Sequence, residues 1–560
     1  MLGRPHSDRT DAMHDDLPPS AASAYAYPLL IKQLLHRSLA LHGAQTICDR
    51  HGRRMSYAAW RERVGRLASA LQAMGVRRGS TVGIMDWDSP RYLETYFAVP
   101  MMGATMFTVN IRLSPEQIAY TLDDAKPSVL LVHVDFAEML GSVLPRLRAR
   151  PRIVVLRDDA RQPLRELDAC GEYEELLAAA GADFEFPDFD ENTTAAVFYT
   201  TGTTGAPKGV CYSHRQIVLH ALTAATALCS PRDGQRLHAQ DVYMPITPMF
   251  HVLAWGIPYV AILLGLRIVL PGRYLPETLL ELLQREQVSF SHCVPTILQM
   301  IVDLAEARDI RFPGWKVVIG GSALPAPLCK AALERGIDVF GGYGMSETGP
   351  IVALAQLVPE LAPQEQLRAR VSTGRALPMV DLRVVDEHMR DVVHDGRTQG
   401  EIVLRAPFLT QGYLHKPAES EELWRGGYLH TQDIAVVRPD GYVQIVDRLK
   451  DVIKTGGEWV SSIEIEHMIA EIPGVQEVAV IGVPDPKWGE RPVAYVVHRP
   501  DTQVTVDDVR ERLLAHVASN RVAKYAVPER SHILFVEQIP KTSVGKLNKK
   551  QLREWAAAIA

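Results

Sequence analysis

The sequence lacks the features that mark membrane, secreted and nucleic-acid-binding proteins. It has no continuous apolar run of the roughly twenty residues that a membrane-spanning helix needs, so no span is predicted and at most a peripheral membrane contact is considered. Its six cysteines are scattered, which argues against a disulfide framework and favours a cytoplasmic location. With a net charge of -6 there is no general basic field, so nucleic acid is not expected as a partner.

The common phosphate-binding loop is also missing. That pattern ends in Gly-Lys followed by Ser or Thr. The nearest stretch, TTGTTGAPKG at 200–209, has Pro207 before Lys208 and Gly209 after it. A plain phosphate-loop NTPase is therefore excluded.

What is present describes an ordinary globular protein of several domains. The chain has 560 residues, which is too long for one hydrophobic core, with 47% hydrophobic and 22% charged residues. Residues 1–24 are polar, of mixed charge and without an apolar signal core, so a disordered leader is predicted. Whether Met1 or Met13 is the true start is left open.

The pattern of residues 25–447 predicts a large N-terminal domain. Helical patterns alternate with short apolar runs such as TVGIM at 81–85, which is typical of two layered α/β subdomains with mostly parallel strands. From 371 to 447 the strands become short and are separated by Gly, Pro and Asp, which indicates a small antiparallel sheet or β-barrel.

Residues 448–560 predict a small, mobile α+β domain joined near 447–451. Ser461, followed three places later by Glu464, is typical of a helix N-terminus. The stretch 475–483 reads as a strand, and 506–517 is amphipathic.

The stretch at 200–209 still has groups that suit phosphate. Its hydroxyls, glycine N–H groups and Lys208 can all donate to an anion. It lies between two extended segments, and Ser213 then begins a long helix. Taken alone it would more often be a surface turn.

Two further glycine-rich stretches could form a ligand site. In GGYGMSETG at 341–349, the glycines allow close approach to a flat ring that Tyr343 can stack on, and Glu347 offers a hard oxygen for Mg²⁺. GGSALP at 320–325 leaves an apolar strand and lacks the Gly-x-Ser-x-Gly spacing of a hydrolase nucleophile.

The remaining candidates lie late in the chain. Asp433 can accept both hydroxyls of a ribose. DRLKDVIKTGGEWVSS at 447–462 and PKTSVGK at 540–546 place lysines beside glycines. Each of these would be a solvated charge if it stood alone.

Together and in this order, these motifs resemble the adenylate-forming superfamily of acyl- and aryl-CoA synthetases, luciferases and peptide-synthetase adenylation domains. Three further stretches, YFAVPMMGA at 96–104, RLSPEQIAYTL at 112–122 and PMFHVLAWGIPY at 248–259, are similar to bacterial medium- and long-chain fatty-acyl-CoA synthetases. The resemblance implies an ATP-dependent, AMP-forming acid–CoA ligase. It would use a carboxylic acid, ATP, Mg²⁺ and coenzyme A, and would be a homodimer.

The resemblance also implies a role for each matching position. The ATP-binding residues would be Thr200, Thr201, Gly202, Thr203, Thr204, Gly205, Lys208, Gly320, Gly321, Ser322, Ala323, Gly342, Tyr343, Gly344, Ser346, Thr348, Asp433 and Arg448. Thr200 and Glu347 would approach Mg²⁺. The acyl pocket would include His251, Trp255, Gly321 and Gly344, and the path of the CoA arm would include Gly456, Gly457, Glu458 and Trp459.

Two lysines and one histidine are the catalytic candidates. Lys546 would bridge the acyl carboxylate and the α-phosphate, and Lys450 would be the hinge of the mobile domain. For His251 a proton-transfer role and a pocket-wall role both stay open. Gln432 departs from the family, which usually has glycine before the aspartate, so its local turn is in question.

The substrate is less defined than the reaction. A medium- or long-chain fatty acid is the leading expectation, and a short methylthio-alkanoic or aromatic acid is the alternative. A catalytically silent relative that binds nucleotide or acyl groups is a third hypothesis, which the intact motif set disfavours.

Overall fold

The structure is a computed structural model, and its first α/β unit is built on a seven-stranded sheet. It describes residues 21–559 except 160–161, 163–166, 201–205, 232–236, 358–360, 456–457, 501, 520 and 543–546. The strands run in the order β7 (Ala169–Glu172), β6 (Arg152–Leu156), β5 (Val129–His133), β3 (Thr81–Met85), β4 (Thr105–Thr108), β8 (Thr194–Thr200) and β9 (Lys208–Ser213). Only β9 runs antiparallel to its neighbour, as the predicted α/β layering requires.

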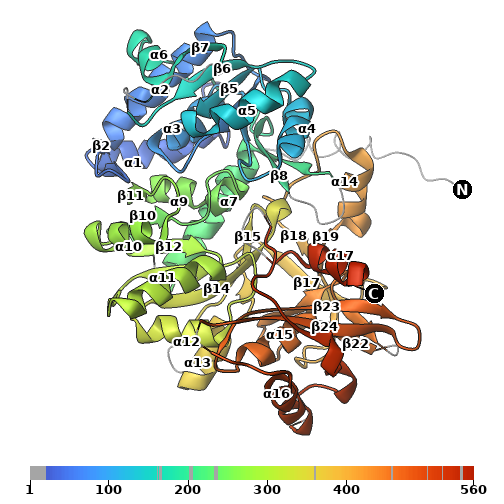
Figure 1. The fold of residues 1–560 in the computed structure, drawn as a ribbon. Helices are drawn as coiled ribbons and strands as arrows, with labels where there is room; N and C mark the ends of the chain where they lie inside the picture. The colour runs from blue at the N-terminus through green and yellow to red at the C-terminus, as the bar shows by residue number, and fades with distance from the viewer. Residues whose placement is uncertain are drawn as a thin grey trace, which may run out of the picture.

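The helices of this unit are α2 (Tyr57–Ala73), α3 (Pro90–Met101), α4 (Pro115–Ala125), α5 (Ala137–Val143) and α6 (Tyr173–Ala179). Most of them connect its parallel strands, and α2 leads into it from β2 (Arg54–Ser56) of the second sheet (Figure 1). Serine caps begin three of them, because a serine hydroxyl satisfies an N–H group that the first turn leaves open; these are Ser56, Ser89 and Ser114.

The second α/β unit has a nine-stranded sheet. Its strand order is β16 (Arg375–Ala376), β15 (Ile351–Leu354), β14 (Asp338–Gly344), β13 (Lys316–Ile319), β12 (Phe290–Cys293), β10 (Val242–Pro245), β11 (Arg267–Leu270), β1 (Thr46–Asp49) and β2 (Arg54–Ser56). Strand β1 is parallel to β11, with Ile47 opposite Ile268, so an early piece of the chain completes a sheet made mainly from later residues.

The helices around this sheet are α1 (Leu35–His42), α7 (His214–Cys229), α9 (Ile257–Leu264), α10 (Pro276–Arg285), α11 (Pro295–Ala307), α12 (Ala326–Glu334) and α13 (Pro363–Arg370). The predicted start of α7 is confirmed, because the Ser213 hydroxyl accepts the Gln216 N–H and the Gln216 side chain accepts the Ser213 N–H. Two predicted α/β subdomains are therefore present.

The β-rich part is a four-stranded antiparallel sheet. It consists of β17 (Asp381–Val385), β18 (Gly400–Arg405), β19 (Leu429–Val437) and β20 (Val443–Arg448), with α14 (Pro417–Leu423) in a connection. Of the two forms expected, sheet or barrel, the described residues form a sheet, since its outer strands β17 and β20 do not pair with each other.

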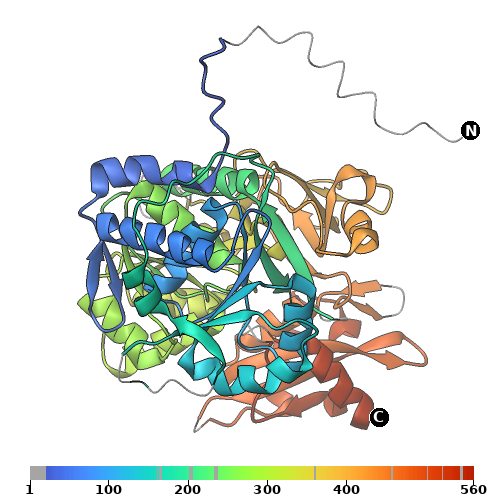
Figure 2. The ribbon, with the colours of Figure 1, turned by 90° about the horizontal axis from the view of Figure 1, so that it is seen from above.

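The last part of the chain forms a separate small α+β domain, which we call the lid (residues 451–559). Its sheet has β22 (Glu458–Val460), β21 (Ile453–Thr455), β24 (Gly489–His498) and β23 (Val475–Asp485), with β25 (Ile533–Phe535) against β24. Its helices are α15 (Ser462–Ala470), α16 (Val506–Ala518) and α17 (Lys549–Ile559). Figures 1 and 2 show the lid at one side of the molecule, next to the β-rich part.

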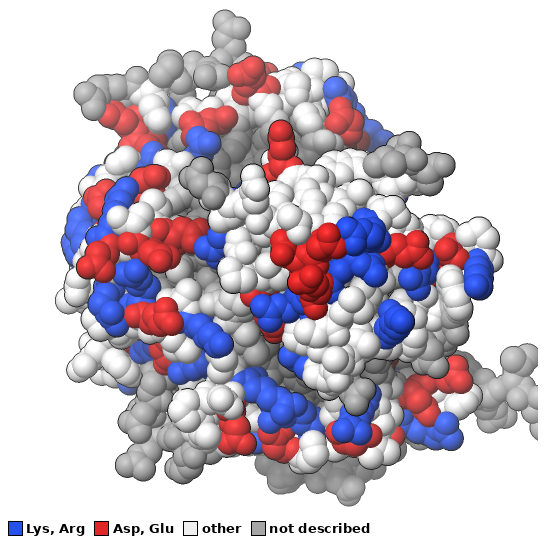
Figure 3. All heavy atoms as spheres, turned by 60° about the horizontal axis from the view of Figure 1, so that its bottom comes forward, with Lys and Arg blue, Asp and Glu red and all other residues white. Residues whose placement is uncertain are grey.

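The surface and the helices agree with the character expected from composition. Figure 3 shows acidic and basic side chains interspersed over one face rather than gathered into separate fields. None of the helices within the described residues is long and apolar enough to cross a bilayer. The predicted leader, residues 1–24, lies almost wholly outside the described residues.

Candidate active site

The threonine- and glycine-rich stretch connects two antiparallel strands. Thr200 is the last residue of β8 and lies opposite Lys208, the first residue of β9. Both are partly buried and flank the connection between the two strands. The predicted phosphate-binding residues between them, Thr201, Gly202, Thr203, Thr204 and Gly205, lie outside the described residues.

Lys208 leads into a chain of contacts that ends at Glu347. Its ammonium group lies 4.8 Å from the centre of the Tyr413 ring, and the Tyr413 hydroxyl donates to Glu347 Oε1 at 2.8 Å. Burial raises the pKa of the Glu347 carboxyl, which is 7% exposed, while Tyr413 and Lys208 oppose that shift. Cation, ring and carboxylate from three segments thus meet beside the hairpin.

A second carboxylate is held at the junction of the two domains. Asp433 lies opposite Arg448 in the β19–β20 pair, with Arg448 Nε 3.3 Å from Asp433 Oδ1. The Tyr343 hydroxyl donates to Asp433 Oδ2 at 2.7 Å. Three of the residues predicted to bind ATP are therefore brought into contact.

Gln432, just before this carboxylate, adopts a left-handed backbone with φ of 59°. Its N–H donates to Glu401 Oε1 at 2.9 Å, and its carbonyl accepts the N–H of Leu449 at 2.9 Å. Left-handed geometry favours glycine, because it brings a Cβ close to the backbone. The unusual residue therefore keeps the glycine-type turn.

Eight of the predicted site residues line one small cavity of about 40 Å³, which we call the acyl pocket because it includes the four residues predicted for the acyl pocket; they are His251, Trp255, Gly320, Gly321, Gly342, Tyr343, Gly344 and Ser346. Its other walls are Val252, Val318, Met345, Pro350 and Ile351. This volume is well below the roughly 300–1,000 Å³ of typical small-molecule sites, so a bound acid needs more room than the observed walls leave. The ends of β13 and β14 supply most of this lining.

Two glycines in this lining are required by close approach. A Cβ on Gly344 would lie 1.4 Å from the carbonyl oxygen of Pro350, and one on Gly320 would lie 2.9 Å from the Trp255 ring. The Gly344 position therefore excludes any side chain. At Gly320 the absence of a side chain lets the indole pack directly on the backbone.

The wall that carries His251 and Trp255 has an uncommon backbone. Val252, Leu253, Ala254 and Trp255 have φ values of 49°, 53°, 46° and 59°, which makes α8 (Val252–Trp255) a left-handed turn. Residues of this kind rarely adopt such angles, and each costs about 1–2 kcal/mol. The turn persists only because its surroundings hold it, and it positions both predicted acyl-pocket side chains.

Lys450 lies between two separately packed bodies. In the described residues no apolar cluster extends across Arg448: the cluster of the β-rich part ends at Ile445, and that of the lid starts at Ile453. The contacts that do cross are polar, with Ser462 N and Oγ donating to Asp447 Oδ2 at 2.6 and 2.5 Å. A junction of this kind is typical of domains that move relative to each other.

Most of the chain matches known protein families. Residues 35–414 match the model of the AMP-binding enzyme family, and residues 464–546 match the model of the AMP-binding enzyme C-terminal domain. The chain belongs to the AMP-binding enzyme family. It is 40% identical over 530 residues to a long-chain-fatty-acid–CoA ligase of Thermus thermophilus, covering 93% of this chain and 94% of that protein.

Two further comparisons agree with this family. A 3-methylmercaptopropionyl-CoA ligase of Ruegeria lacuscaerulensis is 35% identical over 538 residues, covering 94% of this chain and 97% of that protein. The solved structure of the anthranilate CoA ligase AuaEII in complex with anthranoyl-AMP superposes with a TM-score of 0.83 at 25% identity, covering 95% and 99% of the two chains. The predicted family, fold class and reaction class, an AMP-forming acid–CoA ligase, are confirmed.

The residues present at the proposed metal position fit Mg²⁺ only in part. Thr200 and Glu347 are hard oxygen donors of the kind that Mg²⁺ prefers. Within the described ranges, no group of three or more His, Cys, Asp or Glu could hold a metal ion without outside ligands. Phosphate oxygens would have to complete the coordination, which is usual for Mg²⁺ at nucleotides.

Several predicted positions of this AMP-binding enzyme stay untested. Lys546, Gly456 and Gly457 lie outside the described residues, and Glu458 and Trp459 form part of the strand β22. Ser322 and Ala323 are exposed and do not line the acyl pocket. The Thr348 hydroxyl is fully buried and bonds the backbone of Met345 and Pro350.

The structure adds residues to the site that the sequence did not predict. Met345, Pro350 and Ile351 belong to or directly follow the stretch at 341–349, so the motif itself pointed to them. Tyr413, which joins Lys208 to Glu347, follows no quoted motif. The only signal for it was a lone tyrosine in a turn.

Proposed function

We propose that this AMP-binding enzyme activates a medium- or long-chain fatty acid with ATP and transfers the acyl group to coenzyme A. One observation carries the proposal: the acyl pocket and the predicted nucleotide groups share the end of β14. Tyr343 lines the acyl pocket and also binds Asp433, and Glu347 follows three residues after Gly344. An acid in the pocket would therefore present its carboxylate beside the phosphates of a bound nucleotide.

The first step brings two anions together. The acid carboxylate attacks the α-phosphorus of ATP, an acyl–adenylate bond forms, and pyrophosphate leaves. We assign Lys208 to the departing phosphates, which its position at the start of β9 supports, and we assign Lys546 to the charge that grows between carboxylate and α-phosphate. Mg²⁺ held by Glu347, Thr200 and phosphate oxygens would supply further charge stabilisation, and one such contact is worth about 3–4 kcal/mol.

The second step needs a different group over the same carbonyl. The CoA thiolate attacks the acyl carbon, the thioester forms, and AMP leaves. We assign the change to rotation of the lid about Lys450, which removes the Lys546 loop and brings the β21–β22 turn with Gly456 and Gly457 to the site. The polar, hydrogen-bonded junction at Asp447 and Ser462 supports such a rotation.

The small size of the acyl pocket supports a second candidate substrate. Trp255 is only 6% exposed and packs on the backbone at Gly320, which closes one wall of the cavity. A short methylthio-alkanoic or an aromatic acid would need less additional room than a fatty-acid chain.

One assay decides among these possibilities. ATP–pyrophosphate exchange should be measured with saturated acids of increasing length, a methylthio-alkanoic acid and a benzoate-type acid, followed by thioester formation with CoA. Exchange that rises with chain length supports the fatty-acid proposal. A maximum at the short or aromatic acids supports the alternative, and no exchange with any acid overturns both. A homodimer and a cytoplasmic location stay predictions.

A further inference from the structure

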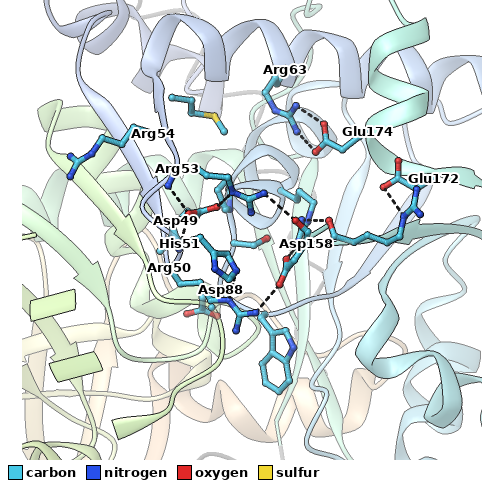
Figure 4. A pocket seen from close by; sticks show the side chains of 18 residues that line it. Asp49, Arg50, His51, Arg53, Arg54, Arg63, Asp88, Asp158, Glu172 and Glu174 are labelled. Carbon is cyan, nitrogen blue, oxygen red and sulfur yellow. Dashed lines mark hydrogen bonds and ion pairs between the residues drawn. The ribbon is translucent and has the colours of Figure 1, made fainter. Parts of the chain in front are cut away.

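Asp88, a buried carboxyl that belongs to none of the quoted motifs, contacts the loop that leads into the acyl pocket. Asp88 lies just before α3 and is 4% exposed. Figure 4 labels it among the charged side chains of a cavity between the two α/β units. Most of those charged neighbours form ion pairs with each other, whereas Asp88 accepts hydrogen bonds from two later segments of the chain.

Asp88 binds the loop at residues 248–251 and the chain just before α10. Its Oδ1 accepts the backbone N–H of Met249 at 2.9 Å, and its Oδ2 accepts the Tyr274 hydroxyl at 2.5 Å. The carbonyl of Met249 accepts the hydroxyl of Tyr96, which is also fully buried. Both backbone polar groups of Met249 are therefore held by side chains of the first α/β unit.

The next residue of the loop is held from the same side. The Thr108 hydroxyl donates to the carbonyl of Phe250 at 2.9 Å, and the Arg112 guanidinium lies 5.9 Å from the Phe250 ring centre. His251 follows immediately, and the left-handed turn begins at Val252. These bonds thus anchor the two residues that precede His251.

Strained backbone persists only where neighbouring contacts leave it no alternative. We propose that Asp88 is a positioning residue for the acid substrate, which fixes the place of His251 and Trp255 by holding Met249. This rests on the proposed function, because it gives these two side chains the role of walls for the acid. Asp88 Oδ1 is the acceptor of the Met249 N–H, so an outward movement of the loop would take this donor away from a buried carboxyl oxygen.

The pattern of bonds predicts how substitutions behave. Asp88→Ala removes both bonds, whereas Asp88→Asn keeps them, since the amide oxygen can accept from Met249 and the amide N–H₂ can donate to Tyr274. We expect Asp88→Ala to raise the KM for the acid by about 10-fold or more and to shift the preferred chain length. Asp88→Asn should restore the acid KM to within about threefold, with the KM values for ATP and CoA little changed.

Glu94 is the matched control. It is also a fully buried carboxyl in α3, it accepts the Tyr173 hydroxyl at 2.5 Å and pairs with Arg63, and its recorded contacts lie away from the loop. Glu94→Ala should lower thermal stability as Asp88→Ala does but leave the preferred acid unchanged. If both variants change the KM values of acid, ATP and CoA alike, Asp88 has only a structural role and the proposal is overturned.

A milder variant keeps the test decisive if Asp88→Ala does not fold. Tyr274→Phe removes one of the two bonds to Asp88, and we expect the acid KM to rise about two- to fivefold with an unchanged ATP KM. No change in the acid KM or chain-length profile would overturn the proposal. Failure of the proposed function is distinct, since the unmodified enzyme would then show no exchange with any acid.

Discussion

The acyl pocket and the junction with the lid are built from opposite kinds of contact. The pocket wall at Val252–Trp255 is strained, and buried side chains from another unit hold it in place. The junction near Lys450 has no apolar cluster across it among the described residues and is joined by buried hydrogen bonds between Asp447 and Ser462. A fixed wall fits the proposed choice of acid, and a junction without a shared apolar core fits the proposed rotation of the lid.

Lys546→Ala should separate the two regions most strongly. We expect adenylate formation to slow by about 10²-fold or more, because a preorganised charge is lost, while thioester formation from a supplied acyl-adenylate continues. ATP–pyrophosphate exchange measures adenylate formation, and single-turnover kinetics measure thioester formation. Lys541→Ala is the control on the same segment, where Lys541 pairs with Glu477 at 2.6 Å. If both reactions slowed equally, the assignment of Lys546 to adenylate formation alone would be wrong.

The pocket side should show a pH dependence of stability that comes from Asp88. Burial raises the pKa of Asp88 to about 7 from 3.8, against the bonds from Met249 and Tyr274 and the charge of Arg112, while Asp86 adds to the rise. The folded protein then binds a proton more tightly than the unfolded chain between these values, so the free energy of unfolding falls as pH rises through that window.

Asp88→Asn removes this titration. Relative to the variant, the unmodified protein should lose roughly 2–3 kcal/mol of stability between pH 5 and 8. Urea midpoints of both proteins across this range give the comparison. A constant difference at all pH values would show that Asp88 is ionised throughout.

Loosening the junction should have a smaller effect on the ratio of the two reactions. Asp447→Ala removes the acceptor of Ser462 N and Oγ, which join strand β20 to helix α15. Charge-assisted bonds contribute about 1.5–3 kcal/mol each at most, and loss of the observed orientation should change the ratio of half-reaction rates by several-fold. Asp508→Ala, at the start of α16, changes a carboxylate within the lid and should leave that ratio unchanged.

Gln432→Gly should have the smallest effect. It relieves a left-handed residue while keeping both backbone bonds, so a gain of about 0.5–1 kcal/mol in stability is expected, with an unchanged KM for ATP. Thermal unfolding measures the stability, and exchange kinetics measure the KM for ATP. A loss of stability would mean that the glutamine side chain contributes more than its backbone costs.

Motifs with fixed spacing allowed much of this molecule to be predicted. The two extended segments that flank the stretch at 200–209 and the start of α7 follow local residue order, and the structure has both. Alternation of short apolar runs with helical patterns was sufficient to identify the two α/β units.

Other features depend on contacts between distant segments. Val252–Trp255 consists of residues common in ordinary helices, and nothing local indicates a left-handed turn. Asp88 has its role only through Met249 and Tyr274, which lie 161 and 186 residues away in the chain. Tyr413 likewise depends on Lys208 and Glu347. These residues could not be identified from one sequence, because their partners are set by tertiary structure.

The pairing of β1 with β11 also affects how the chain is made. Residues 46–49 leave the ribosome long before residues 267–270, and the whole seven-stranded sheet is synthesised between them. During that interval the strand Ile47–Asp49, buried in the finished enzyme, has an open edge and no parallel partner. Completion of the nine-stranded sheet therefore waits for a long-range pairing, which makes it a late and slow event in folding.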